Sequence, residues 1–181
     1  MNQSHRVRPI LLWGMMGAGK SALARHLCEN FEIESVDLDT LIEIEHNASV
    51  AHLIETRGMA WFRGAERQTL FALLDQNRAQ VIALGGGTLL DPVFRKSVRE
   101  RTFICTLTAH PSVLHQRVAL EPERRPLLFG ASHDVLSALT VLVDERQDAY
   151  LDTDCLIDTS DLSIEQAAEL ITPLFLNSEA A

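Results

Sequence analysis

The stretch GMMGAGKS at positions Gly14–Ser21 decides the fold of this chain. It matches G-x-x-x-x-G-K-[ST], the phosphate-binding P-loop pattern, in which glycines let the loop turn tightly and aim its backbone N–H groups at a polyphosphate. Lys20 adds a compact positive charge for the β and γ phosphates, and Ser21 adds a hydroxyl for Mg²⁺. The helix that begins here directs the positive end of its dipole at the same anion.

The flanking residues supply the context that this pattern needs. The apolar run Ile10–Trp13 precedes the loop and is typical of a buried parallel strand. After the loop, apolar residues recur at helical spacing, namely Ala22, Leu23, Leu27 and Cys28. Strand, glycine loop and helix together favour a nucleotide site over the alternative of a glycine-rich turn that binds nothing.

Length and charge limit the classes of function. The chain has 181 residues, which suits a single domain, 1–181, with a substantial core. It carries 16 Lys and Arg against 25 Asp and Glu, a net charge of −9, which argues against a broad nucleic-acid surface. No apolar run approaches the roughly 18 residues of a membrane span, and residues 1–8 form no signal-peptide core. We therefore expect no nucleic-acid or membrane partner, and a cytoplasmic location.

The cysteines point to the same compartment. Cys28, Cys105 and Cys155 form no C-x-x-C pair, and an odd number without a disulfide framework predicts reduced thiols inside the cell. Cys105 and Cys155 lie in apolar, strand-like runs, so we expect both to be small core residues. The seven histidines show no metal-binding spacing and are expected on the surface.

Short apolar runs alternate with helical patterns along the chain. Such alternation predicts an α/β fold of three layers, in which helices cover both faces of a parallel sheet and ligands lie beyond the carboxyl ends of its strands. Five runs are the strand candidates: Ile10–Trp13, Ser35–Leu38, Val81–Leu84, Phe103–Leu107 and Cys155–Ile157. The sequence therefore predicts a central five-stranded parallel sheet.

Two segments interrupt this alternation. Residues 38–76 hold too many helical stretches for one crossover, which predicts a small helical subdomain beside the site. Residues 119–134 are irregular and rich in proline and arginine, which predicts a mobile lid. The segment contains the pair Arg124 and Arg125, and a lid arginine can close over a transferring phosphoryl group and neutralise its charge.

Two carboxylates follow the second strand candidate. Asp37 and Asp39 are two apart, so on an extended segment their side chains point to the same side. Near a P-loop, one carboxylate can hold Mg²⁺ through water, and the other can orient an attacking hydroxyl and accept its proton. The alternative is a polar strand end or a helix cap in front of residues 40–42.

Other candidates have plainer alternatives as well. Gly85–Gly87 end a strand candidate, where a ligand can approach the backbone closely, although three glycines also suit a flexible turn. Arg63 and Glu66 are three apart on a helical stretch, so Glu66 can either form a surface ion pair or hold Arg63 against a substrate carboxylate. Arg146 lies in the helical stretch Val135–Tyr150, and by spacing alone a solvated helix residue is the more typical interpretation.

Six motifs in this order resemble the shikimate kinase family over about residues 10–150. Only the P-loop is specific alone, but the order and spacing of the set are specific together. The motifs are Gly14–Ser21, Asp37-x-Asp39, Phe62-Arg63-x-x-Glu66, Gly85–Gly87, Arg125-Pro126-Leu127-Leu128 and Arg146-x-x-x-Tyr150. The resemblance implies a P-loop kinase fold with a substrate-binding subdomain at about 38–76, a mobile lid at about 119–134, and a monomer.

The family's activity is the ATP-dependent phosphorylation of the 3-hydroxyl of shikimate, on the route to chorismate and the aromatic amino acids. The resemblance thus implies ATP as co-substrate, shikimate as acceptor and Mg²⁺ as cofactor. It implies Asp39 as the base, with Lys20 and Arg125 as further catalytic residues. ATP is expected at Gly17, Ala18, Gly19, Lys20, Ser21, Ala22, Arg117 and Arg125, shikimate at Asp39, Arg63, Gly86, Gly87 and Arg146, and Mg²⁺ at Ser21 and Asp37.

The chain departs from the family's pattern near Arg63. Met59 stands where a glutamate usually follows the glycine, which deprives Arg57 of a local partner, and Trp61 and Gly64 are less usual neighbours. Three other functions stay open on the sequence: a related kinase with a gluconate-type acceptor, a non-catalytic ATP-binding paralogue, and a nucleoside monophosphate kinase. For the last of these we identify no arginines that would bind a phosphate acceptor.

Overall fold

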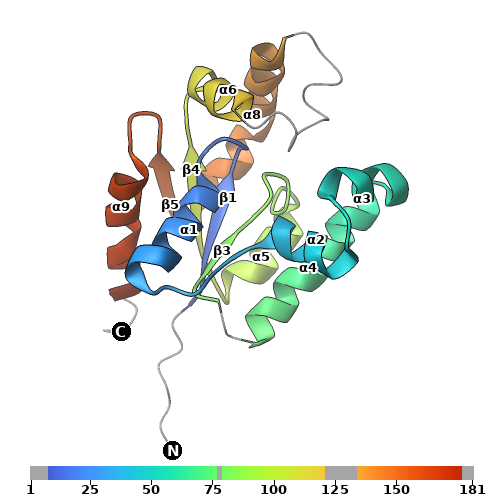
Figure 1. Ribbon diagram of the computed structural model, residues 1–181, viewed down its shortest axis with the longest axis horizontal. Helices are drawn as coiled ribbons and strands as arrows, with labels where there is room; N and C mark the ends of the chain where they lie inside the picture. Colours follow the sequence, from blue (N-terminus) through green and yellow to red (C-terminus); the bar gives the residue numbers. More distant parts are fainter. Residues whose placement is uncertain (1–7, 77–78, 121–133, 177–181) are drawn as a thin grey trace, which may run out of the picture.

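The computed structural model describes residues 8–76, 79–120 and 134–176. Its centre is a five-stranded parallel sheet with the strand order β2-β3-β1-β4-β5 (Figure 1). The strands are β1 Ile10–Gly14, β2 Ser35–Asp37, β3 Val81–Ala83, β4 Phe103–Thr108 and β5 Cys155–Asp158. The predicted sheet is confirmed: every strand begins at the expected residue and ends within one residue of the expected position.

β1 lies in the middle of the sheet, between β3 and β4. Leu12 pairs with Ala83 of β3 on one side and with Cys105 of β4 on the other. Both faces of β1 are covered, because Leu11, Leu12 and Trp13 are completely buried. The loop that follows β1 therefore starts at the centre of the sheet's carboxyl edge, where strands on both sides can contribute to one site.

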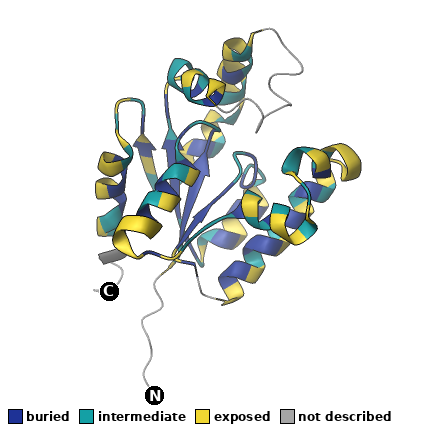
Figure 2. Ribbon diagram, in the orientation of Figure 1, coloured by how far each residue is buried: buried dark blue, intermediate teal, exposed yellow. Residues whose placement is uncertain are grey.

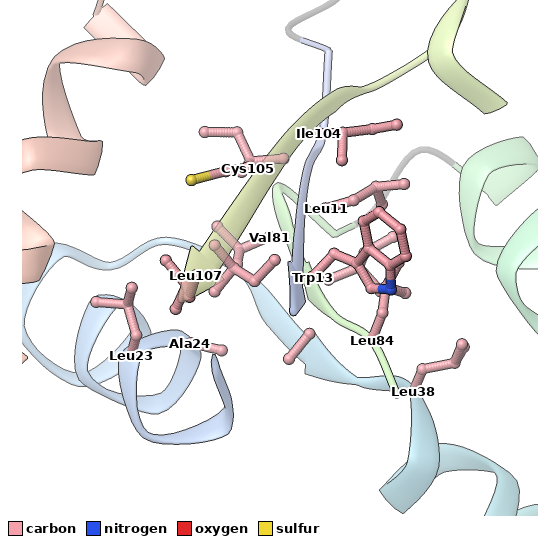
Figure 3. Packing of buried hydrophobic residues seen from close by; sticks show 14 of the residues in the cluster. Leu11, Trp13, Leu23, Ala24, Leu38, Val81, Leu84, Ile104, Cys105 and Leu107 are labelled. Carbon is pink, nitrogen blue, oxygen red and sulfur yellow. The ribbon is translucent and has the colours of Figure 1, made fainter. Parts of the chain in front are cut away.

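Helices cover the two faces of the sheet. On one face α1 (Lys20–Phe31) packs against α9 (Ile164–Leu176). On the other face Trp13 contacts α5 (Pro92–Arg99) and α8 (Val135–Leu151), and α6 (Pro111–Ala119) packs on α8. Figure 2 shows the strands buried and the exposed residues of the flanking helices on their outer sides, and Figure 3 shows the α1 side chains Leu23 and Ala24 near Leu107. The predicted three-layer arrangement is confirmed.

Three helices connect β2 to β3 in the sequence, and in space they lie beside the edge of the sheet that β2 forms (Figure 1). They are α2 Leu38–His46, α3 Val50–Arg57 and α4 Met59–Gln76, and they pack on one another. Side chains fix where two of them begin: Asp37 accepts a hydrogen bond from the Thr40 backbone N–H, and Ser49 accepts one from that of His52.

None of the helices in the described ranges combines the length and the apolar character that a membrane-spanning helix needs.

The two strand cysteines differ in burial. Cys105 of β4 is completely buried, as predicted. Cys155 is only half-buried and packs against the core from the edge of the sheet, so the prediction that it is a core residue holds only in part. The reason is its position, because β5 is an edge strand and Cys155 is its first residue. An apolar stretch of sequence does not reveal which strand ends up at the edge of a sheet.

Candidate active site

The P-loop joins β1 to α1 at the centre of the carboxyl edge. Gly14, Gly17 and Gly19 have positive φ angles of 123°, 79° and 96°. A Cβ atom on Gly14 would lie 2.0 Å from the carbonyl oxygen of Leu107, so β4 leaves room for glycine alone. In the described residues no side chain caps the start of α1. The first backbone N–H groups of this helix are therefore available to bind an anion.

Lys20 reaches back over this loop. Its ammonium Nζ donates hydrogen bonds to the carbonyl oxygens of Gly14 and Met15, each at 2.8 Å. The side chain is buried, although it carries a charge. A buried ammonium held by carbonyl oxygens concentrates positive charge at the mouth of the loop, where a polyphosphate would interact with it strongly.

Ser21 and Asp37 meet beside the loop. The Ser21 hydroxyl donates a hydrogen bond of 2.5 Å to Asp37 Oδ2, while Asp37 Oδ1 accepts from the Thr40 backbone at 3.1 Å. The predicted helix cap is therefore confirmed for one oxygen of Asp37, while the other oxygen faces the P-loop serine. A hydroxyl and a carboxylate oxygen are the ligands that Mg²⁺ prefers, so this pair fits such an ion.

Asp39 does not lie on an extended segment, so the geometric basis of the pairing with Asp37 was wrong. β2 ends at Asp37, and Asp39 lies in the first turn of α2. The cap that Asp37 forms is the physical reason, since it starts the helix one residue earlier than a continuing strand would allow. Asp39 still faces the site: its Oδ1 lies 3.3 Å from the position that a Cβ on Gly85 would take.

The environment of Asp39 favours its protonated form. Oδ1 is buried and has no hydrogen-bond partner in the part of the chain that the structure describes. Burial raises the pKa of Asp39 from 3.8 to about 7, and the charges of Glu66 and Asp37 act in the same direction. Lys20 and Arg63 oppose this rise only in part. A carboxylate with a pKa near neutrality and an unpaired oxygen is suited to accept a proton from a bound hydroxyl.

The three glycines after β3 are where these groups converge. A Cβ on Gly85 would lie 2.9 Å from Glu66 Oε1, and one on Gly86 would lie 3.1 Å from the carbonyl oxygen of Gly14. A Cβ on Gly87 would lie 2.1 Å from Nη2 of Arg63. A different neighbouring group therefore occupies the space where each glycine would otherwise carry a side chain. The triplet is a tightly packed junction, and the alternative of a flexible turn is excluded.

The buried carboxylate of Glu66 holds the Arg63 side chain in place. Its guanidinium forms an ion pair with Glu66, which is completely buried, whereas the Arg63 side chain keeps 30% of its surface exposed. Glu66 is fixed in turn by the Thr88 hydroxyl, which donates a hydrogen bond of 2.5 Å to Oε1. This is no surface ion pair, because the carboxylate is inside the protein and the arginine presents its fork at the site.

Arg146 and Tyr150 come from α8 and reach the same junction. The Tyr150 hydroxyl donates a hydrogen bond of 2.9 Å to the carbonyl oxygen of Gly86, and its ring packs edge-on against Trp13 of β1. Arg146 Nη1 lies 3.7 Å from Met15 Sδ and 3.5 Å from a Cβ position on Gly86. The arginine is therefore directed at the site, and the interpretation as an ordinary solvated residue does not describe it.

Arg117 lies on the other side of the P-loop. It donates hydrogen bonds to the carbonyl oxygens of Gly17 and Thr159, at 3.3 and 2.7 Å. The Thr159 hydroxyl also lies 3.1 Å from the carbonyl oxygen of Ala18. Together with α1 and the start of α9 they line a pocket of about 370 Å³ beside the loop. Thr159 was missed in the sequence, because no motif marks it and only the pairing of β5 with β4 brings it here.

The structure accounts for one of the three sequence departures near Arg63, the tryptophan at position 61. Trp61 compensates for the carboxylate that Met59 does not provide, because the guanidinium of Arg57 lies 4.4 Å from the centre of its ring, and His46 packs against the same ring. Gly64 faces open space on α4. Neither change touches Arg63 or Glu66. Arg125 and nearly all of the segment predicted as a lid lie outside the described residues.

A second, larger cavity lies away from these groups. Its volume is about 980 Å³, and it runs between α1, β2, α2 and α4, with Val36, Leu41, Ile44 and Trp61 in its walls. The described lining includes Glu34 and Glu45 but no lysine or arginine. This groove therefore does not suit a phosphate or a carboxylate, and the smaller pocket at the P-loop is the better candidate for a nucleotide.

Comparison with known proteins identifies relatives of this arrangement. A sequence profile described as shikimate kinase matches residues 16–174. A shikimate kinase of Xanthomonas oryzae pv. oryzae is 39% identical over 151 residues, covering 80% of this chain and 82% of the relative. A second, from Caldanaerobacter subterraneus subsp. tengcongensis, is 31% identical over 170 residues and covers 94% and 97%.

A solved structure matches over nearly the whole chain. The shikimate kinase from Acinetobacter baumannii in complex with shikimate superimposes with a TM-score of 0.85 at 28% sequence identity. The match covers 98% of this chain and 97% of that one.

The raised pKa of Asp39 predicts a pH-dependent gain in stability on removing its charge. The folded state prefers protonated Asp39, so this contribution to stability is complete below about pH 4 and is lost as the pH rises through about 7. We predict that Asp39→Asn increases the free energy of unfolding, and that this gain grows by about 2–3 kcal/mol between pH 5 and pH 8 in urea denaturation.

The matched control is Asp75→Asn, which removes the carboxylate of an exposed ion pair with Arg101. Its effect should stay nearly constant over the same pH range. A stability difference for Asp39→Asn that does not change with pH would contradict the raised pKa.

Proposed function

The chain belongs to the shikimate kinase family, so it transfers the γ-phosphoryl group of ATP to the 3-hydroxyl of shikimate, and we propose which residues do this work. The reaction belongs to the route to chorismate and the aromatic amino acids. The observation that carries the proposal is the buried, unpaired carboxylate oxygen of Asp39 between the P-loop and the glycine triplet. Asp39 lies between two halves of the site, a donor half that binds ATP and an acceptor half that binds shikimate.

The donor half is the P-loop and its pocket. The γ and β phosphates lie against the loop amides and Lys20, with the start of α1 behind them. The rest of ATP extends into the pocket lined by Arg117 and Thr159. Arg125, which lies outside the described residues, remains the predicted lid arginine of this half.

The acceptor half is built for a carboxylate with hydroxyl groups. Arg63 and Arg146 supply two cations at the glycine junction, and they bind the shikimate carboxylate. Gly86 and Gly87 let the ring of the substrate approach the backbone. Glu66 is already paired with Arg63 and with Thr88, so Asp39 alone of these carboxylates receives the substrate hydroxyl.

Asp39 acts as the base in the chemical step. It accepts the proton of the 3-hydroxyl while that oxygen forms a bond to the γ phosphorus and the bond from phosphorus to the β,γ-bridging oxygen breaks, releasing ADP. Lys20 stabilises the charge that moves toward the bridging oxygen. A pKa near 7 leaves Asp39 ionised in much of the enzyme at neutral pH, yet basic enough to take the proton.

Ser21 and Asp37 are the residues that would hold Mg²⁺. Their oxygens already meet at 2.5 Å, and no group of three or more acidic, histidine or cysteine residues in the described ranges forms a separate metal cage. This small donor set fits an ion that keeps several waters and takes phosphate oxygens as ligands. When bound, Mg²⁺ neutralises charge on the phosphates.

We further propose a cytoplasmic monomer. Support for the location comes from the free cysteines and from the absence, in the described residues, of a helix that could span a membrane. Support for the monomer comes from the site itself, since the described residues of one chain supply both of its halves.

The function is tested with an acceptor panel. In a coupled assay we expect ADP release only when ATP, Mg²⁺ and shikimate are all present, and no turnover above background with gluconate at the same concentration. A folded enzyme that turns over gluconate faster than shikimate would contradict the proposed acceptor half.

Replacing Arg63 tests the binding of the carboxylate. We predict that Arg63→Ala raises the KM for shikimate roughly 10- to 100-fold, because it removes charge-assisted hydrogen bonds, and leaves the KM for ATP nearly unchanged. Arg63→Lys keeps the charge but not the two-pronged guanidinium, so its KM for shikimate should lie between those of the unsubstituted enzyme and Arg63→Ala.

The matched control is Arg67→Ala on the next turn of α4, where the arginine pairs with Asp91 outside the site. It should change neither KM. If Arg63→Ala altered the KM for ATP and spared that for shikimate, the acceptor half would be misplaced.

A further inference from the structure

Two cysteines that the reaction does not use lie side by side in the sheet. Cys105 of β4 and Cys155 of β5 are direct partners in the parallel register. Neighbouring strands lie about 4.8 Å apart, within the Cα separation of about 4.4–6.8 Å that disulfides span. Residues paired in this way point to the same face of the sheet, and Figure 3 shows the Cys105 sulfur on the side opposite Trp13.

The register pairing places the two thiols close enough to influence each other's protonation. A hydrogen bond with Cys105 lowers the pKa of Cys155 to about 7, while burial and the charge of Asp154 oppose this effect. The same contact, together with burial, raises the pKa of Cys105. The pair is therefore asymmetric: the half-buried Cys155 forms the thiolate, and the buried Cys105 stays a thiol.

We propose that Cys105 and Cys155 form a dithiol that hydrogen peroxide oxidises to a disulfide. The Cys155 thiolate attacks a peroxide oxygen, the O–O bond breaks, and Cys155 becomes a sulfenic acid as hydroxide leaves. The Cys105 sulfur then attacks the sulfenic sulfur while its proton passes to the departing hydroxide, which leaves as water. The hydroxide from the first step takes up the proton that Cys155 released on ionising, so peroxide is reduced to two waters for each disulfide and no further oxidant is required.

The position of the pair on the sheet allows the second step. Cys155 is the first residue of the edge strand β5, where the backbone has neighbours on one side only and can adjust to the new bond. Cys105 lies beside it on the inner strand β4 and is completely buried, so it is protected from peroxide but stays next to Cys155. The arrangement provides one accessible thiol that reacts first and one that resolves it.

The disulfide would bear on the nucleotide pocket. β5 leads directly to Thr159, whose hydroxyl lies 3.1 Å from the carbonyl oxygen of Ala18 and 3.0 Å from that of Thr108. Thr159 also accepts hydrogen bonds from Arg117. A bond that draws β5 toward β4 shifts these contacts, so oxidation should weaken ATP binding more than shikimate binding.

The test uses Cys28→Ser, which removes the exposed third cysteine and leaves the pair as the only thiols. After peroxide treatment and alkylation under denaturing conditions, we expect intact mass to fall by two hydrogen atoms with no alkylated thiol, and dithiothreitol to reverse this. The KM for ATP of the oxidised protein should rise, with that for shikimate unchanged.

Two further variants separate the steps. Cys28→Ser combined with Cys155→Ser should keep one alkylatable thiol after peroxide. Cys28→Ser combined with Cys105→Ala should leave a sulfenic acid on Cys155 that dimedone traps. Two alkylatable thiols in oxidised Cys28→Ser, or a sulfinic acid on Cys155 without a disulfide, would overturn the dithiol. A disulfide that leaves the KM for ATP unchanged would overturn its link to the nucleotide pocket.

Discussion

The site depends on a stretch of backbone that carries no side chains. Gly85–Gly87 follow β3, which lies next to the central strand β1, and a side-chain polar group approaches each of the three places where a Cβ would stand. Glu66 and Asp39 approach the first, Arg146 and Tyr150 the second, and the guanidinium of Arg63 the third. Residues from α2, α4 and α8 can therefore meet beside the P-loop, because the glycine backbone between them has no side chains to keep them apart.

Function has a cost in stability at this junction. Asp39 is buried with an unpaired oxygen next to two other carboxylates, which is the arrangement that folding alone would avoid. The neighbouring Glu66, by contrast, is satisfied by Arg63 and Thr88 and serves to position the arginine. The two neighbouring carboxylates thus differ in hydrogen bonding, because the protein supplies partners to Glu66 and leaves an oxygen of Asp39 unpaired, and the proposed function uses that oxygen for the substrate.

Much of this was predictable from the sequence, and the failures have a common cause. Apolar runs predicted where every strand begins, and the P-loop predicted the donor half, since both signals are local. The helical position of Asp39, the exposure of Cys155 and the role of Thr159 depend on contacts between distant segments. Period-two reasoning failed at Asp39 because the Asp37 side chain starts a helix there. Strand order, too, follows from packing that no single segment encodes.

The central claim is that Asp39 takes the proton from the acceptor hydroxyl. The most direct test is the single-turnover rate of phosphoryl transfer in Asp39→Asn, with the dissociation constants for ATP and shikimate measured separately by calorimetry. A missing general base should slow transfer by about 10²–10⁴-fold, while ATP binds with nearly unchanged affinity. A rate within a few fold of the unsubstituted enzyme, with both substrates bound, would contradict the account.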